Sequence, residues 1–210
     1  MAEDFKIGQL LSSRLCHDLI GAASAVNAGL ELLGQDGGDD DGALALMRMS
    51  ASRLTGRLSF FRAAFGIGGG SQGELSFTEA HNLAIDWMAG GKVILNWSEA
   101  TAVAAPATAI KMLMVMVVIG EECLPRGGVL AVHASALPDG IGVAVQAQGV
   151  GAVLRETTVI ALAEDCRIDK LSVHNIHAHY AQGLAHRLGG VIEATTDADE
   201  VRLAALISID

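Results

Sequence analysis

Residues 1–66 contain two long helix-forming stretches separated by the segment GQDGGDDDG at 34–42. Gly and Asp clusters of this kind end helices and form exposed turns. The two stretches are therefore expected to fold back on each other as an antiparallel helical hairpin. Apolar residues recur at spacings of three and four, which favours packing of the kind found in helical bundles. In the first helix this apolar stripe consists of Leu11, Leu15, Leu19, Ala22, Val26, Leu30 and Leu33.

Two antiparallel helices cannot bury a two-sided apolar surface by themselves. A second copy of the chain is the simplest source of two more helices, so we expect a homodimer held by a four-helix bundle. A second breaker-rich segment, GIGGGSQG at 66–73, has almost no side chains to pack and is expected to link two domains. The predicted domains are residues 1–66 and 74–210.

Residues 74–210 alternate between helical and strand patterns. Ser76 and Glu79 form a capping box that predicts a helix through Trp87. Long helices next to strands with short turns indicate an α/β sandwich in which one sheet is covered on one face. The chain as a whole is therefore expected to be α+β. Further helices are predicted at 106–124, 152–164 and 172–188, and strands at 92–97, 128–135, 141–148, 191–197 and 201–209.

Composition excludes several classes of protein. A net charge of −10 argues against a nucleic-acid-binding surface, which needs clustered Lys and Arg. The most apolar run, MLMVMVVIG at 112–120, is too short to span a membrane, and the first residues do not resemble a secretory signal. Cys16, Cys123 and Cys166 show no CxxC spacing, which favours reduced thiols and a cytoplasmic location.

His17 lies on the side of its helix opposite the apolar stripe, so we expect it to be accessible. Asp18 follows it directly and can tune the imidazole or its tautomer. A neutral imidazole nitrogen is a good nucleophile toward an activated phosphoryl group. From the residues alone, a solvated surface histidine without a function remains an equal alternative. The helix positions that surround His17 are Ser13, Arg14, Gly21, Ser24 and Ala28.

The stretch SRLCHDLIGAASAVNAGLELL at 13–33, followed by a helix that ends in SFFRAAFG, resembles the ChpT-type histidine phosphotransferases of alphaproteobacteria. The resemblance is strong in the helical region and looser in residues 74–210. It implies a dimeric helical hairpin joined to a degenerate form of the histidine-kinase ATPase domain. It also implies that His17, with Asp18 beside it, accepts a phosphoryl group from the receiver domain of a hybrid histidine kinase and passes it to response-regulator receivers.

The resemblance carries further expectations about partners and cofactors. Mg²⁺ would be held by the receiver, and this chain would bind neither ATP nor a metal. The helix positions around His17 named above would contact the receiver. The family pattern has Ser-Pro after HDLI, whereas Gly21 and Ala22 stand here. Gly21 has no side chain to hold a water, which argues against phosphatase activity and leaves phosphoryl transfer intact.

Residues 74–210 lack the features that a kinase uses to bind nucleotide. The segment that would carry an Asn for Mg²⁺ has Val115 and Ile119 at the matching turns. The turn that would read adenine, QAQGVG at 146–151, has Ala147 or Gln148 in place of the acid. No Gly-x-Gly lid precedes the last helix. An apolar patch cannot hold a metal–triphosphate, so ATP binding is not expected.

A zinc site and a scaffold role are the alternatives to this interpretation. His174 and His177 are one helical turn apart, but no carboxylate or cysteine near them on that helix completes a zinc site, so no metal is expected. The alternative function is a non-catalytic, kinase-like scaffold that binds and regulates a kinase or a receiver. A phosphotransferase and such a scaffold would have the same fold, and only phosphoryl exchange would distinguish the two functions.

Overall fold

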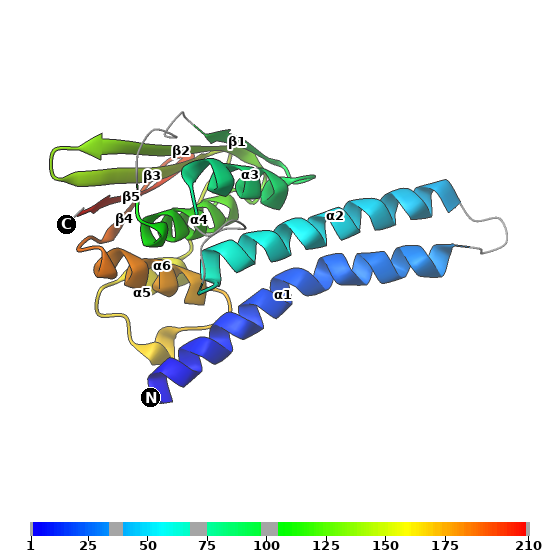
Figure 1. The fold of residues 1–210 in the computed structure, drawn as a ribbon, viewed down its shortest axis with the longest axis horizontal. Coiled ribbons are helices and arrows are strands. Elements are labelled where there is room, and N and C mark those ends of the chain that lie inside the picture. Colours follow the sequence, from blue (N-terminus) through cyan, green and yellow to red (C-terminus); the bar gives the residue numbers. More distant parts are fainter. Residues whose placement is uncertain (1, 34–39, 68–74, 98–104, 209–210) are drawn as a thin grey trace.

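Two long helices project from a globular part in the computed structural model, which describes residues 2–33, 40–67, 75–97 and 105–208 (Figure 1). These are α1 (Ala2–Leu32) and α2 (Asp40–Phe65), and they lie side by side as the predicted hairpin. Gly29 lies where the two helices approach each other, since a Cβ there would collide with the side chain of Met47. Most of the Gly/Asp-rich segment between the helices falls outside the described residues.

The globular part is built on one mixed, five-stranded sheet with the order β1-β2-β3-β5-β4. Strand β1 runs parallel to β2, and the other neighbours are antiparallel. All five strands were predicted, with ends that differ by at most two residues. Their bounds are β1 (Val93–Trp97), β2 (Gly128–Leu137), β3 (Gly140–Gln148), β4 (Ile192–Asp197) and β5 (Glu200–Ile207).

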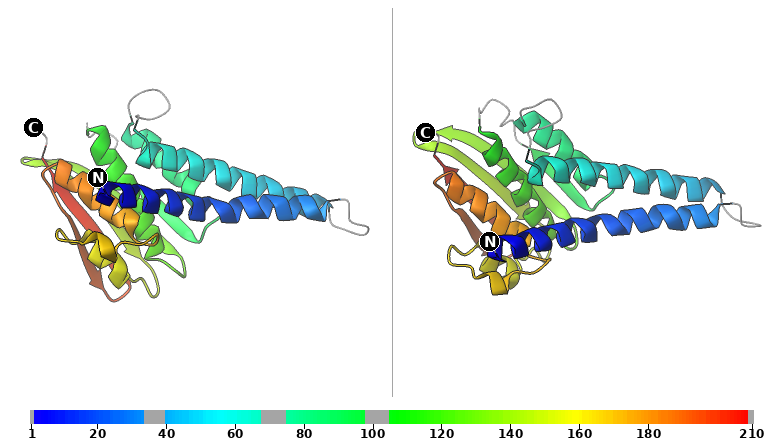
Figure 2. Two further views of the ribbon diagram at one scale, coloured as in Figure 1. Left: turned by 90° about the horizontal axis from the view of Figure 1, so that it is seen from below. Right: turned by 60° about the horizontal axis from the view of Figure 1, so that its bottom comes forward.

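Helices cover the face of the sheet that is turned toward the hairpin (Figure 2). They are α3 (Phe77–Met88), α4 (Ala107–Glu122), α5 (Glu156–Leu162) and α6 (Ile176–Arg187). Helix α4 is buried from Ile110 through Gly120 except at Lys111, because the sheet lies on one side of it and other helices on the other. The predicted α+β fold with a sheet covered on one face is confirmed.

Two helices are shorter than predicted. The segment expected at 152–164 is helical only over 156–162, and the one expected at 172–188 begins at Ile176. A 3₁₀ turn at Ile168–Lys170 and a tight turn at 172–175 precede α6. The side chain of Asn175 forms hydrogen bonds with this turn and so gives its backbone an alternative to the helix.

The base of the hairpin shares one hydrophobic core with the globular part. Phe60 and Phe61 of α2 pack against Trp87 of α3, with ring centroids 4.8 and 5.1 Å apart. Phe65 packs against Tyr180 of α6 at 5.1 Å. The sequence predicted two regions joined by a Gly-rich linker, most of which lies outside the described residues. It did not predict that their cores are continuous.

The tip of the hairpin has no such cover from its own chain. We call residues 20–32 and 40–52 the distal half and residues 2–19 and 53–65 the proximal half. Leu30 was predicted to belong to the buried stripe, but it is 55% exposed because Gly29, and not Leu30, faces α2. The other large apolar side chains exposed on the distal half are Ile20, Leu32, Leu44 and Met49.

Two further features bear on the environment of the protein. None of the described helices is both long enough and apolar enough to cross a membrane. All three cysteines are free: Cys16 is exposed, Cys123 is buried and Cys166 is intermediate. Burial raises the pKa of the Cys123 thiol to about 12, which keeps this side chain protonated and unreactive.

Candidate functional site

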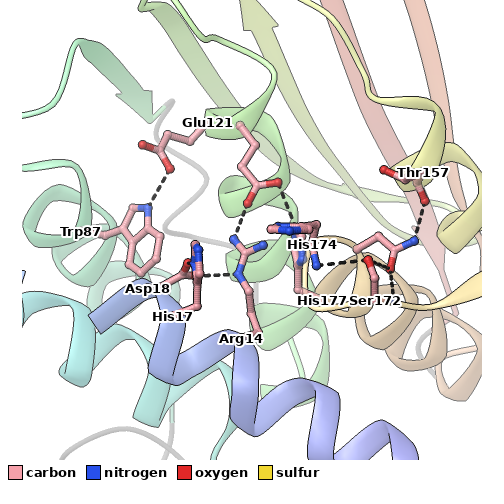
Figure 3. Close-up of polar contacts among 11 residues, drawn as sticks. Arg14, His17, Asp18, Trp87, Glu121, Thr157, Ser172, His174 and His177 are labelled. Atoms are coloured by element: carbon pink, nitrogen blue, oxygen red, sulfur yellow. Dashed lines mark hydrogen bonds and ion pairs between the residues drawn. The ribbon is translucent and has the colours of Figure 1, made fainter. Parts of the chain in front are cut away.

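His17 projects from the proximal half of α1, and 63% of its side chain is exposed, as predicted (Figure 3). Its Nδ1 lies 3.1 Å from Oδ1 of Asp18. The other carboxylate oxygen of Asp18 accepts a hydrogen bond of 2.6 Å from Nε of Arg14, one turn earlier. Asp18 is therefore held from one side by a cation and faces the histidine ring with its other oxygen.

This contact determines which ring nitrogen can react. A carboxylate next to Nδ1 favours the tautomer that carries its proton on Nδ1. The lone pair of the neutral ring is then on Nε2, the nitrogen that Asp18 does not engage. An exposed imidazole in this state can attack a phosphorus or another electrophile that a partner presents.

Arg14 is only 7% exposed, although the helical wheel placed it on the same side as His17. Besides Asp18, its guanidinium binds Glu122 at the end of α4 through Nη2 and Oε1. Burial disfavours the charged form of Arg14, but the two carboxylates outweigh this and raise its pKa. The predicted contact of Arg14 with a partner is therefore wrong, because its side chain is turned inward and joins the hairpin to the globular part.

Glu122 also faces α6, where Nε2 of the buried His177 lies 3.4 Å from its Oε2. This distance permits an electrostatic contact, but the atoms do not meet the geometry of a hydrogen bond. Burial alone would raise the pKa of Glu122, but His177 and Arg14 together lower it to about 2. Arg14, Glu122 and His177 thus form a largely buried polar network between α1, α4 and α6, which we call the interhelical clamp.

The pKa of the neighbouring carboxylate, Glu121, is shifted upward, in the direction opposite to that of Glu122. Burial raises its pKa, and the hydrogen bond that it accepts from Nε1 of Trp87 at 3.4 Å offsets this only in part. Arg57 of α2 stacks over the same indole, 5.0 Å from its centroid, and donates from Nη1 to the backbone oxygen of Asp18 at 2.6 Å. Arg57 therefore supports the backbone directly after His17.

A second histidine lies beside the first. The rings of His17 and His174 are 5.9 Å apart between centroids and nearly perpendicular, at 88°. His174 is exposed and comes from the turn before α6. Sequence reasoning missed this pairing, as it missed the clamp and Arg57, because no local pattern shows which residues of the globular part face α1.

Comparison with known proteins assigns the chain to a family. Residues 77–200 match the model for the histidine phosphotransferase C-terminal domain. The chain belongs to the histidine phosphotransferase family. This confirms the resemblance found in the sequence. The matched residues include His174 and the clamp residues Glu122 and His177, but they do not include His17.

Relatives of known sequence or structure agree with this assignment. A protein phosphotransferase ChpT from Brucella abortus is 41% identical over 127 residues, which is 60% of this chain and 60% of that protein. A solved bacterial phosphotransferase is 30% identical, covers 96% of both chains and has a TM-score of 0.81. The histidine kinase AdeS of Acinetobacter baumannii is 12% identical with a TM-score of 0.51 over 92% of this chain and 98% of that one, which shows a shared fold.

The remaining predicted contact positions lie on the surface of this histidine phosphotransferase family member. Ser13, Gly21, Ser24 and Ala28 are all exposed. A Cβ added to Gly21 would meet nothing within 4 Å, so the surface of α1 is open one turn after His17. A partner can therefore approach the imidazole closely along this side of α1.

The residues that we expected at the nucleotide-binding positions of a kinase are core residues here. Val115, Ile119 and Ala147 are all at most 1% exposed and belong to the hydrophobic core. Among the described residues, no group of three or more His, Cys, Asp or Glu side chains is arranged to hold a metal ion. His174 and His177 do not converge, since His177 faces Glu122 in the interior and His174 faces His17 at the surface.

Proposed function

We propose that this protein is a phosphorelay histidine phosphotransferase in which His17 is the phosphoacceptor. The observation that carries the proposal is an exposed imidazole whose Nδ1 faces a carboxylate that is itself anchored by a buried arginine. Membership of the histidine phosphotransferase family supports the same chemistry. The donor would be the receiver domain of a hybrid histidine kinase, and the acceptors would be response-regulator receivers.

The transfer step follows from this geometry. The Nε2 lone pair attacks the phosphorus of an aspartyl phosphate, an N–P bond forms, and the P–O bond to the receiver aspartate breaks. That aspartate leaves as a carboxylate, and the ring becomes a phosphoimidazolium that still carries its Nδ1 proton. Asp18 offsets the positive charge on the ring. Transfer to the next receiver reverses each of these changes.

We place the receiver on the exposed side of α1 at Ser13, Gly21, Ser24 and Ala28. Receivers hold Mg²⁺ in an acidic pocket, and this ion would offset charge on the phosphoryl oxygens during transfer. The present chain would contribute the nucleophile and the docking surface, without ATP or a metal of its own. The buried apolar residues Val115, Ile119 and Ala147 support this division of roles. Such a relay would operate in the cytoplasm, where receivers are found.

We further propose that the protein is a homodimer. The exposed apolar side chains of the distal half would pack against a second hairpin and complete a four-helix bundle. Exposed Leu and Met side chains concentrated on one projecting element are typical of an interface. In this arrangement the hairpin would serve as the dimerisation and phosphotransfer domain, and the globular part as a kinase-like domain.

The test is transfer from a phosphorylated receiver. Receiver domains of the hybrid histidine kinases of the same organism, charged with radiolabelled acetyl phosphate, are mixed with the full-length protein. We expect label that is lost in acid and retained in alkali, and we expect none on His17→Ala. His186→Ala is the matched control, because it removes another exposed imidazole and should be labelled like the wild type.

Each outcome separates the proposal from its alternatives. Label that persists on His17→Ala would assign the phosphoacceptor to another residue. Binding of receivers without any label on the wild type would instead favour the non-catalytic scaffold. Labelling of the wild type from radiolabelled ATP alone would show an active kinase and contradict our expectation that this chain does not bind ATP.

A further inference from the structure

His174 is held next to His17 by a turn that side-chain hydrogen bonds fix in place. The neighbouring Asn175 is 1% exposed, and its Oδ1 accepts hydrogen bonds from the backbone N–H of Ser172 at 2.7 Å and from its hydroxyl at 3.2 Å. Its Nδ2 donates to the backbone oxygens of Thr157 at 2.9 Å and Lys170 at 3.2 Å. The backbone N–H of His174 itself donates to the Ser172 hydroxyl at 3.3 Å.

The same turn is fixed relative to α1 by the interhelical clamp. His177, one turn after His174, contacts Glu122, and Glu122 binds Arg14, one turn before His17. The rings of His17 and His174 are therefore connected through a short path of largely buried polar groups, as well as by their direct contact. This is how the globular part, which is far from α1 in sequence, places an exposed ring at the phosphoacceptor.

A phosphoryl group on His17 would extend outward from a ring that already touches His174. Phosphoryl oxygens carry negative charge, and in its neutral form an imidazole has one N–H to donate. Asp18, which lies next to the His17 ring, is a carboxylate and has no N–H to donate. The Arg14 guanidinium is directed inward to Asp18 and Glu122. His174 is thus a neutral group in contact with the His17 ring that can donate to the phosphoryl oxygens.

We propose that His174 is a second imidazole of the phosphotransfer site, which donates a hydrogen bond to the phosphoryl group on His17. This inference rests on the proposed role of His17. It gives the globular part a direct role in the reaction, because the group that stabilises the phosphohistidine comes from the turn before α6. His174 lowers the energy of the phosphorylated form and of the transfer step, while Asp18 directs the reaction to Nε2.

The test compares two substitutions at this exposed position in the full-length protein. His174→Phe keeps a flat ring beside His17 but removes the N–H, whereas His174→Gln restores a neutral N–H donor. A hydrogen bond to a charged acceptor corresponds to about tenfold in a rate or equilibrium constant. We therefore expect His174→Phe to slow transfer at saturating phosphorylated receiver about tenfold, and His174→Gln to recover most of it. His186→Phe, on the last turn of α6, is the matched control.

Two further measurements separate this role from packing. The affinity for the receiver should remain unchanged in His174→Phe, so that only the maximal rate falls. The ³¹P chemical shift of the phosphohistidine should change in His174→Phe and not in His186→Phe, because only the former removes a donor to the phosphoryl oxygens.

The outcomes distinguish this inference from the proposed function. If the wild type and His174→Phe are labelled at the same rate and show the same ³¹P shift, the inference is wrong and the role of His17 stands. If His174→Gln is as slow as His174→Phe, the N–H is not the cause and the inference is also wrong. If the wild type is not labelled at all, the proposed function fails first.

Discussion

The two halves of the hairpin differ in how their surfaces are covered. The proximal half packs into the hydrophobic core of the globular part and buries Arg14 between Asp18 and Glu122. The distal half projects away from the globular part and leaves Leu30, Leu32 and Met49 about half exposed. A continuous pair of helices therefore serves two purposes. One end fixes His17 against its own chain, and the other presents the exposed apolar side chains that we propose as the dimer interface.

The largest effect is expected from a change in the proximal half. Arg14→Ala leaves the carboxylate of Glu122 mostly buried without its cation, and losing one partner of a buried pair costs about 3 to 5 kcal/mol. Arg48→Ala, which removes an exposed arginine from the distal half, should change stability by less than about 0.5 kcal/mol. Urea unfolding of both variants measures the difference. Equal effects would mean that the clamp does not hold the two parts together.

The distal half should respond to a change that leaves the fold intact. Leu30→Glu places two charges in a symmetric interface and removes apolar burial worth about 2 kcal/mol from each chain, so we expect the dimer to weaken at least about a hundredfold. Ile94→Glu on β1 is the control, since Ile94 is also largely exposed but lies outside the hairpin. Sedimentation equilibrium gives both dissociation constants. A wild-type protein that is monomeric at high concentration would refute the bundle.

Glu122 of the clamp and its neighbour Glu121 sharpen the comparison, because their pKa values move in opposite directions. The pKa of Glu122 is lowered from 4.5 to about 2, so its carboxylate stabilises the fold above about pH 4.5 and this stabilisation is lost as the pH falls toward 2. Glu122→Gln should therefore destabilise the protein by about 2 to 3 kcal/mol at pH 7 and much less near pH 2. Urea unfolding across this pH range gives the difference.

Glu121→Gln is the adjacent control and should behave in the opposite way. Burial raises the pKa of Glu121, so its charged form costs stability at neutral pH. The variant should be as stable as the wild type at pH 7 or more stable. A loss of stability similar to that of Glu122→Gln would show that both carboxylates are needed as anions.

The smallest effect concerns the surface of α1. A Cβ added at either Gly21 or Gly8 would meet nothing within 4 Å, so both positions have room for a larger side chain. Gly21 lies one turn after His17, whereas Gly8 lies on the opposite side of the helix from His17, about 13 Å away along the axis. Gly21→Tyr should slow receiver-dependent labelling about tenfold by obstructing the approach to His17, and Gly8→Tyr should not. Equal labelling rates would move the docking surface away from this face.

Local patterns in the sequence predicted most of the fold. Alternating and heptad-like spacings gave the five strands and both hairpin helices, and the capping residue Ser76 marked the start of α3, where its Oγ accepts from the backbone N–H of Glu79. The helix ends near Asn175 were wrong because a buried side chain, and not helix propensity, determines the backbone there. The exposure of His17 was predicted from helical periodicity alone.

The surroundings of His17 depend on contacts distant in sequence and could not be predicted. A helical wheel considers one helix alone and therefore placed Arg14 on the same side as His17. In the structure the long Arg14 side chain turns toward α4, where it binds Glu122. His174 and Arg57 reach the site only because α6 and α2 pack against α1. Such contacts require knowledge of how helices far apart in sequence are arranged.

The most direct test of the account is to locate the phosphoryl group on the ring. The protein is labelled with ¹⁵N in its histidines, phosphorylated by a receiver, and studied by ³¹P- and ¹⁵N-detected NMR. Because Asp18 engages Nδ1, the account predicts a single N–P coupling to Nε2 of His17. A phosphoryl group on Nδ1, or on any other residue, would contradict it.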